Sequence, residues 1–298
     1  MHCAKEKQCD ASLQCTMNNV VILGNKGFIG THLENYFKSQ KISVQGMDMP
    51  DVDLTQQNAI EKLSSAFDES SAVVFLSCIK KEHGDTFDIF LKNCAMVANV
   101  CEAVEKKKAS RIIYFSSAAV YGEEVHNLSI NEKTNINPTS YYGLAKFVGE
   151  RMLTMTAEKN NITLVCMRPP VIYGPGDKPC YGPSGFCSAA RQKQQITVWG
   201  DGSELREFIY VDDIIQVVSQ LLKNNYHGPL NVAQGKSVTF TDIIKTIEKY
   251  TGKQDIQFRE RTKKKVDNAF DNSLFKQLFS QVQLTPVEKG IQQMLEHK

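Results

Sequence analysis

The chain has 298 residues, 42% of them hydrophobic and 23% charged, with a formal net charge of +2. This length and hydrophobic content suffice to bury a full core, which predicts a globular protein. The lysine runs 106–108 and 263–265 are short and lack interleaved aromatic residues, so we expect no nucleic-acid partner.

No stretch of the sequence approaches the roughly 18 consecutive apolar residues that a membrane helix needs, and we expect no membrane partner. The nine cysteines are scattered, and the polar first residues lack the apolar run of a secretory segment. We therefore expect reduced thiols and a cytoplasmic location. Cys3, Cys9 and Cys15 match no zinc-ligand spacing, so we expect no metal site.

Residues 1–16 are polar and without periodicity, and we expect them to be a disordered leader. From residue 17 the chain alternates short β-type runs with helical patterns. This alternation predicts a parallel sheet covered by helices on both faces, a Rossmann-type doubly wound α/β domain over 17–170. Strands are expected at 20–23, 42–47, 72–77, 111–116 and 162–167, and helices at 28–39, 56–66, 86–107 and 141–158.

The composition of the sequence changes after residue 168. Glycine and proline are dense over 173–187, which predicts a long irregular loop. Shorter elements follow, which predicts a smaller C-terminal substrate-binding lobe over 171–298, interleaved with the first domain and enclosing the substrate against it. Helices are expected at 212–222, 241–251 and 286–296, and a strand at 229–232.

The first strand runs into a glycine-rich turn and then a helix. Gly24 permits the tight turn, Gly27 lets backbone N–H groups approach a pyrophosphate, and Gly30 lets the helix pack closely on the strand. Because strand, glycines and helix come in the required order, we expect Gly24, Gly27, Phe28, Ile29 and Gly30 to bind a dinucleotide.

Two aspartates follow the second predicted strand. Asp48, eighteen residues after Gly30, can accept hydrogen bonds from the ribose hydroxyls of adenosine and would repel a 2′-phosphate, which favours NAD over NADP. The alternative is that Asp48 only ends the strand. Asp53 is expected to be a second contact near the adenine.

Tyr142 and Lys146 are four residues apart in a predicted helix, so both side chains project from one face. The lysine ammonium would favour the phenolate of the tyrosine, which is otherwise a poor base at neutral pH. The spacing alone arises often by chance, but with the motifs that surround it, it indicates Tyr142 as the catalytic acid/base and Lys146 as its partner, which would also hold the cofactor ribose.

From residue 17 onward the chain resembles the extended short-chain dehydrogenase/reductase family, in its group of nucleotide-sugar epimerases, dehydratases and reductases. Six segments match this family in order. They are the glycine turn at 24–30, Asn93 with Asn99, the run 115–122 (Phe-Ser-Ser-Ala-Ala-Val-Tyr-Gly), the run 138–146 around Tyr142, the run 168–176 (Arg-Pro-Pro-Val-Ile-Tyr-Gly-Pro-Gly), and 199–202 leading to 206–213.

The resemblance implies roles for two further residues. Ser117, three residues before Val120, would hydrogen-bond the reacting sugar oxygen, with its neighbour Ser116 as the alternative. Arg206 would bind the diphosphate of the substrate, because a planar guanidinium can donate paired hydrogen bonds to phosphate oxygens. The alternative for Arg206 is a surface ion pair with Glu204 or Glu207.

Three departures from the family pattern limit the reaction. Ala118 and Ala119 stand where dehydratases carry Asp-Glu, which argues against dehydration. Val171 stands where many members have an asparagine that contacts the substrate. The segment between Asp48 and the strand at 72–77 is short, which resembles the keto-sugar reductase branch.

We interpret the chain as an NAD-dependent nucleotide-sugar epimerase, in which hydride would move between a sugar carbon, C4 by the resemblance, and the nicotinamide. The alternative is an NAD(P)H-dependent nucleotide-4-keto-sugar reductase. A non-catalytic NAD-binding regulatory protein is disfavoured because Ser117, Tyr142 and Lys146 are all retained. The resemblance further implies a homodimer formed through the helices at 86–107 and 141–158.

Overall fold

The computed structural model describes residues 19–180 and 182–297, and the predicted leader at 1–16 lies outside these described residues. Six strands form the central sheet, and each neighbouring pair runs parallel. They are β1 (Asn19–Leu23), β2 (Val44–Met47), β3 (Ser71–Phe75), β4 (Arg111–Phe115), β6 (Thr163–Arg168) and β11 (Gly228–Asn231).

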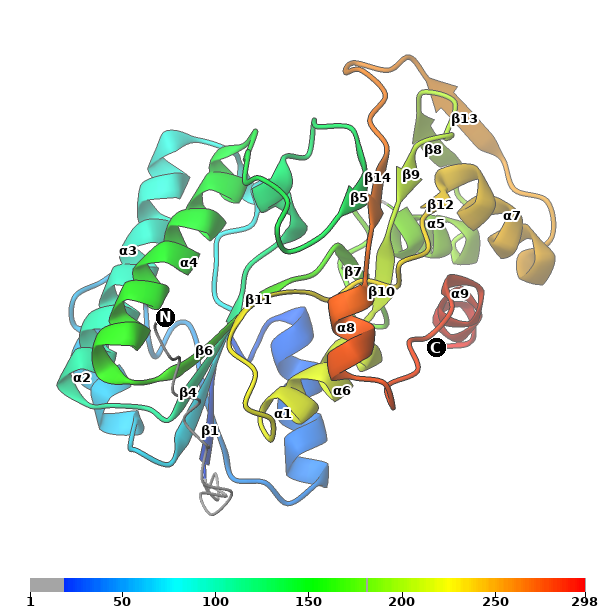
Figure 1. Cartoon of the computed structure of the whole chain (residues 1–298). Coiled ribbons are helices and arrows are strands. Elements are labelled where there is room, and N and C mark those ends of the chain that lie inside the picture. Colours follow the sequence, from blue (N-terminus) through cyan, green and yellow to red (C-terminus); the bar gives the residue numbers. More distant parts are fainter. Residues whose placement is uncertain (1–18, 181, 298) are drawn as a thin grey trace, which may run out of the picture.

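The sheet order is β11-β6-β4-β3-β1-β2 (Figure 1). β3 and β4 are buried along their whole length, which explains why they read as continuous apolar runs rather than alternating ones. The chain moves outward from β1 to β2 and then returns to the other side of β1 with β3. In such sheets ligands bind at the carboxyl ends of the strands, beside this point of reversal.

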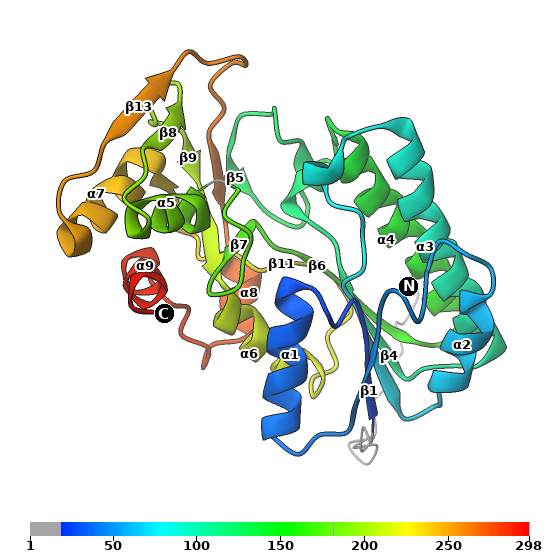
Figure 2. The same ribbon diagram turned by 180° about the vertical axis from the view of Figure 1, so that it is seen from behind.

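Helices cover both faces of the sheet, as Figures 1 and 2 show from opposite sides. Alternate residues of β1 point to the two faces: Val21 packs with the first helix layer, and Ile22 packs with the second. The first layer consists of α2 (Ala59–Ala66), α3 (Phe87–Lys106) and α4 (Tyr141–Asn160), and the second of α1 (Phe28–Ser39), α6 (Val211–Leu221) and α8 (Ser273–Leu278).

A second lobe stands beside the carboxyl edge of the sheet (Figure 1). Its apolar core gathers around Tyr173, Phe208 and Ile247, which are fully buried or nearly so. The lobe has the helices α5 (Gly182–Arg191), α7 (Phe240–Thr251) and α9 (Val287–Glu296). Its strands pair two by two: β7 (Val171–Tyr173) with β10 (Phe208–Tyr210), β8 (Ile196–Trp199) with β13 (Ile256–Arg259), and β9 (Leu205–Arg206) with β12 (Val238–Thr239).

A further strand pair links the two parts, β5 (Asn127–Ile130) with β14 (Asn268–Phe270). Short 3₁₀ helices, η1 (Lys81–His83) and η2 (Ala118–Tyr121), follow β3 and β4. Because β11 and α6 belong to the central sheet and its helix layer, residues after 170 return to the first part of the molecule.

The predicted doubly wound α/β fold is confirmed. The long irregular loop predicted at 173–187 is wrong in its second half, because α5 begins at Gly182. Pro183 lies in the first turn of this helix, where an amide has no intrahelical acceptor and its absence costs nothing. Turn-forming residues at a helix start therefore resemble a loop in the sequence.

Candidate active site

A cleft of about 1070 Å³ lies at the carboxyl edge of the sheet, between the sheet and the second lobe. Every residue that the sequence assigns to cofactor binding, catalysis or substrate binding lines this one cleft. The glycine turn and Asp48 come from the β1 and β2 ends, and Ser117 follows β4. Arg206 is on β9, in the second lobe. The fold therefore brings together residues that lie far apart in the sequence.

The three glycines of the turn are held in different ways. Gly24 has a φ of +95°, and a Cβ there would lie 2.9 Å from the Ser77 hydroxyl oxygen. A Cβ on Gly30 would lie 2.1 Å from the carbonyl oxygen of Gly24, so helix α1 could not pack where it does. Both positions therefore require glycine for the turn itself.

Gly27 is different, because it has an ordinary extended backbone and precedes the first turn of α1. A Cβ at Gly27 would have one neighbour, the Gly24 carbonyl oxygen at 3.4 Å. The missing side chain leaves space in the cleft in front of the helix terminus, whose first amides have no intrahelical acceptor. Phe28 and Ile29 line the same space. This cradle fits the pyrophosphate of a dinucleotide.

Asp48 follows the last residue of β2 and has both carboxylate oxygens anchored. One accepts from the Lys26 backbone N–H at 3.0 Å, and the other from the Met49 N–H at 2.7 Å. Asp53 accepts from the backbone and the hydroxyl of Thr55, and these hydrogen bonds lower the pKa of the Asp53 carboxyl. Both carboxylates are thus ordered acceptors in the cleft, suited to ribose hydroxyls.

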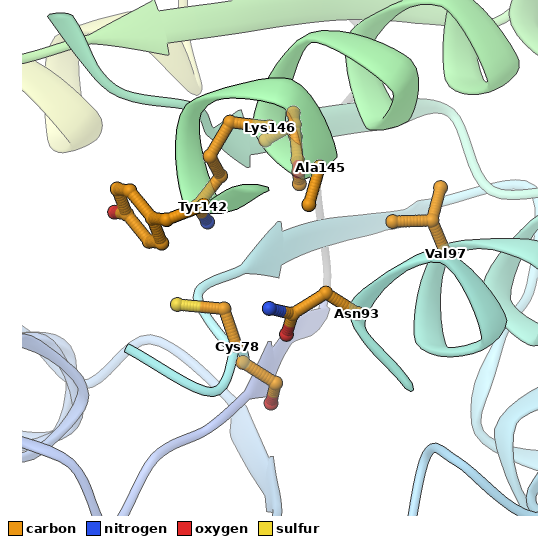
Figure 3. Close-up of a pocket in the computed structure, with 8 residues that line it drawn as sticks. Cys78, Asn93, Val97, Tyr142, Ala145 and Lys146 are labelled. Atoms are coloured by element: carbon orange, nitrogen blue, oxygen red, sulfur yellow. The ribbon is translucent and has the colours of Figure 1, made fainter. Parts of the chain in front are cut away.

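Tyr142 and Lys146 lie in the first two turns of α4. The helix begins there because the Ser140 hydroxyl accepts from the Gly143 N–H at 3.1 Å. Lys146 is only 4% exposed, and its Nζ donates to the Phe115 carbonyl at 2.6 Å. The same Nζ lies 5.8 Å from the centre of the Tyr142 ring (Figure 3). The predicted pair is therefore side by side, with the lysine anchored to the end of β4.

The two serines after β4 have separate environments. Ser116 is buried, and its hydroxyl donates to Glu150 Oε1 at 2.5 Å. Ser117 is half-buried, and its hydroxyl oxygen accepts from the Ala119 N–H at 3.1 Å. Because the Ser116 proton is already committed to a carboxylate, the geometry favours Ser117 as the hydroxyl available to a ligand.

A small cavity of about 10 Å³ lies behind this pair, lined by Tyr142, Lys146, Cys78 and Asn93 among others (Figure 3). The Asn93 side chain accepts from the Ile79 N–H at 2.8 Å and donates to the Ile79 carbonyl at 3.0 Å. It thereby clamps the segment that leaves β3 and lines the cleft.

Asn99, six residues further along α3, holds a second loop, the one between β2 and α2. Its amide donates to the carbonyls of Leu54 and Gln56 at 2.8 and 3.1 Å. These carbonyls belong to the turn that begins at Asp53. The two asparagines therefore hold two loops that border the cleft.

Arg206 lines the cleft from β9 in the second lobe. Its guanidinium donates to the carbonyls of Leu205 and Val266. Glu204 instead pairs with Arg261 at 2.6 Å. The alternative of an Arg206 ion pair with Glu204 or Glu207 is not seen among the described residues.

Glu207 is buried next to Arg206, and the sequence did not reveal its role. Its carboxylate accepts from the backbone N–H groups of Gly235 and Phe270 at 2.9 and 3.0 Å. Burial raises the pKa of this carboxyl. Glu207 thus ties β14 and the loop after β11 to the wall of the cleft.

A group of charged residues at the cleft was also not anticipated. Lys178 pairs with Glu82 at 3.5 Å, and Asp177 accepts from the Ser184 hydroxyl at 2.6 Å. Burial raises the pKa of the Asp177 carboxyl. These residues are on loops and a 3₁₀ turn, where no periodic pattern could have indicated that they meet.

Over residues 19–180 and 182–297, no three histidine, cysteine or acidic side chains are grouped so that they could hold a metal ion. No helix within these ranges is long and apolar enough to cross a membrane.

Known proteins resemble the chain along most of its length. An uncharacterized UDP-glucose epimerase of Bacillus subtilis (strain 168), YtcB, is 24% identical over 302 residues, covering 91% of this chain and 95% of that protein. UDP-glucose 4-epimerase of Thermotoga maritima, solved with UDP-glucose, has a TM-score of 0.83 at 20% identity, over 94% of this chain and 98% of its own. UDP-glucose 4-epimerase of Thermus thermophilus, in complex with NAD, has a TM-score of 0.82 at 19% identity, with coverage of 94% and 98%.

The solved structures share the fold. Membership follows from the sequence, because the model of the NAD dependent epimerase/dehydratase family matches residues 20–233. This match spans the glycine turn, the Tyr142–Lys146 helix and the segment that contains Arg206. The resemblance read from the sequence motifs is confirmed: the chain belongs to the NAD dependent epimerase/dehydratase family of enzymes.

Proposed function

We propose that the protein is an NAD-dependent nucleotide-sugar 4-epimerase. The observation that carries this proposal is that Ser117, Tyr142 and Lys146 line one cleft, with Lys146 beside the Tyr142 ring and hydrogen-bonded to the residue two positions before Ser117. The glycine turn, which would hold the pyrophosphate of a dinucleotide, lines the same cleft, and the cleft has room for a second ligand. A hydroxyl, a phenol and an ammonium grouped in this way suit proton transfer to and from an alcohol.

The residues of the cleft fit NAD. Gly27 leaves the cradle for the pyrophosphate, Asp48 and Asp53 offer ordered acceptors for the adenosine side, and Lys146 is placed for the second ribose. NAD, when bound, supplies a reversible hydride acceptor to the reaction.

We assign the proton chemistry to the residues of this chain. Tyr142 takes the proton of the sugar hydroxyl and returns it, while Ser117 hydrogen-bonds the same oxygen. Lys146 stabilises negative charge on the phenol oxygen, since its ammonium lies beside the ring. Ala118 and Ala119 have no group that could remove a proton from a neighbouring carbon, so we expect no elimination of water.

The test is the cofactor balance during turnover. Purified protein is incubated with UDP-hexoses, because several relatives are named UDP-glucose epimerases, and with other nucleotide sugars. We expect interconversion of the hydroxyl epimers without added reductant and without net change of NADH absorbance. Stoichiometric loss of NADH or NADPH with a 4-keto sugar, and no interconversion, would contradict the epimerase.

A reductase is the second candidate, and one observation favours it. The end of β2 at Met47 and the start of β3 at Ser71 are connected by α2 and the two loops that flank it. This compact segment resembles the keto-sugar reductase branch. Asp48 disfavours a reductase that uses NADPH, because an acidic side chain at the adenosine ribose repels the 2′-phosphate.

We also propose that the protein is a homodimer. Phe87 and Leu91 of α3 are 57% and 50% exposed, and Tyr141 of α4 is exposed beside them. The rings of Phe87, Phe90 and Tyr141 lie close together, at 5.9, 6.0 and 6.1 Å between centroids. An apolar patch of this kind on two adjacent helices suits burial against the same patch of a second copy. We also propose a cytoplasmic location, because scattered cysteines suit a reducing compartment.

A further inference from the structure

A buried ion pair lies under the catalytic residues, and nothing in the proposed proton transfer uses it. Glu150 is four residues after Lys146 and eight after Tyr142, so the three side chains follow one face of α4. Glu150 is 4% exposed and faces Arg168, the last residue of β6. The guanidinium donates from Nε to Oε1 at 2.8 Å and from Nη2 to Oε2 at 2.6 Å.

The pair has a third partner directly next to Ser117. The Ser116 hydroxyl donates to Glu150 Oε1 at 2.5 Å, and Lys146 Nζ donates to the carbonyl of Phe115 at 2.6 Å. Helix α4 therefore holds two consecutive residues at the end of β4, and Ser117 is the next one.

Ser117 is held from its other side as well. The backbone N–H of Ala118 donates to the carbonyl of Pro169 at 2.9 Å, and Pro169 directly follows Arg168. Arg168 Nη1 also donates to the Tyr121 hydroxyl at 2.9 Å, at the far end of η2. Ser116 is thus hydrogen-bonded to Glu150, and Ala118 is hydrogen-bonded to the residue that follows Arg168. The residues on both sides of Ser117 are therefore connected to the same ion pair.

Stability alone does not explain this arrangement. A buried ion pair contributes little net stability in comparison with an apolar pair of similar volume, because both charges lose their hydration. A bidentate arginine–carboxylate contact does fix distance and orientation more strictly than apolar packing does. The gain from the pair is therefore geometric.

We infer that Glu150 and Arg168 form a positioning pair, which acts through Ser116 to set the hydroxyl of Ser117 relative to Tyr142 and Lys146. This inference rests on the proposed function, in which these three groups share one substrate oxygen. The pair ties the helix that carries two of them to the strand end that carries the third.

The first test compares two serine variants. Ser116→Ala removes the hydrogen bond to Glu150, and Ser71→Ala is the matched control. Ser71 is also buried and donates to a carboxylate, Asp68 Oδ1 at 2.9 Å, but it lies at the amino end of β3, away from the carboxyl ends of the strands where the cleft lies. Activity is measured well below the melting temperature of each variant, so that a loss of stability alone does not change the rate.

We expect Ser116→Ala to lower kcat by about tenfold to a hundredfold, since displacements near 1 Å have such effects, with KM and NAD affinity nearly unchanged. Ser71→Ala should retain the wild-type kcat. Equal kcat in both variants and the wild type would overturn the inference, and so would a rise in KM with kcat unchanged.

The second test does not depend on turnover. Hydrogen exchange of the NAD-loaded protein should be faster at the amides of residues 116–120 in Ser116→Ala and in Arg168→Lys. The lysine keeps the positive charge but cannot make the two parallel hydrogen bonds of the guanidinium. Unchanged exchange there in Ser116→Ala overturns the inference, even if Arg168→Lys does not fold. If the wild-type protein turns over no nucleotide sugar, the proposed function fails, and exchange alone decides about the positioning pair.

Discussion

Lys146 is a buried lysine whose ammonium is held by a backbone carbonyl and two aromatic rings rather than by a carboxylate. Its ammonium donates to the Phe115 carbonyl and lies 5.1 and 5.8 Å from the ring centres of Tyr114 and Tyr142. No carboxylate oxygen in the described part of the chain lies within ion-pair distance of it. The positive field of Lys146 therefore remains available to an anion that forms on the Tyr142 oxygen.

Replacing Tyr142 by phenylalanine tests the central residue. The ring and its packing remain, but the proton donor is lost, so we expect turnover to fall by about 10²–10⁴-fold. NAD affinity should be retained, because the proposed cofactor contacts come from other residues. Steady-state kinetics and a binding titration measure the two effects, and near wild-type activity would show that another group moves the proton.

At this scale the sequence predicted the residues with a recognisable spacing or motif. Tyr142 and Lys146 have the i, i+4 pattern, and Ser117 sits in a run typical of the family. Glu150 continues the same spacing by one more turn, but sequence alone does not tell whether a helical glutamate faces solvent or the core. Its partner Arg168 comes from a different strand, and only the fold brings the two together.

The glycine turn and α1 allow a prediction at the scale of an element. Gly30→Ala would place a Cβ 2.1 Å from the Gly24 carbonyl oxygen, and we expect a loss of about 1–3 kcal/mol in the free energy of unfolding from overpacking. Gly27→Ala should cost less than about 1 kcal/mol, since the extended N-cap backbone accepts alanine.

Both variants should bind NAD weakly, but for different reasons. In Gly30→Ala the turn itself is disturbed, whereas in Gly27→Ala the new methyl group occupies the cradle. Urea unfolding and NAD titration separate the two effects. Tight NAD binding by Gly27→Ala would refute the proposed position of the pyrophosphate.

His32 connects three elements and predicts a pH dependence. From α1 its Nε2 lies 2.9 Å from the carbonyl oxygen of Pro175, and its Nδ1 lies 3.7 Å from Asp212 at the start of α6. The contact with Asp212 raises the pKa of the imidazole above its ordinary value of 6.5. Protonation of His32 therefore stabilises the folded state.

The contribution is fully present below the unfolded pKa and is lost as the pH rises through the higher folded pKa. We expect the difference in unfolding free energy between wild type and His32→Gln to be larger at about pH 5.5 than at about pH 8.5. Urea denaturation at both values measures it. A difference that grows with pH would contradict the assigned sign.

Among the elements, the long periodic ones were predictable and the short ones were not. The expected helix at 28–39 is α1, and the expected helix at 86–107 differs from α3 by one residue at each end. Strands of two to four residues in the second lobe, such as β9 and β12, are too short for alternation to develop. Their pairing depends on tertiary contacts, which local sequence does not encode.

At the scale of the whole molecule, the aromatic patch on α3 and α4 predicts the state of assembly. Leu91→Asp places a charge in the centre of the proposed interface and should convert a dimer to a monomer, because an unpaired buried charge is costly. Leu128→Asp is the control, since Leu128 is equally exposed but lies on β5. Sedimentation velocity distinguishes the two states, and a monomeric wild type at micromolar concentration would exclude the proposal.

The position of β11 has a consequence for synthesis of the protein. Residues 169–227 separate β6 from β11, its neighbour in the sheet. While the ribosome produces this intervening stretch, β6 is an open edge with unpaired backbone groups, and Val165 and Met167 lack the cover of α6. The nascent chain that ends after β6 is therefore prone to aggregation until α6 and β11 have been synthesised and cover these groups. Chaperone demand during translation should peak in this interval, before β11 pairs with β6 and α6 covers this face of the sheet.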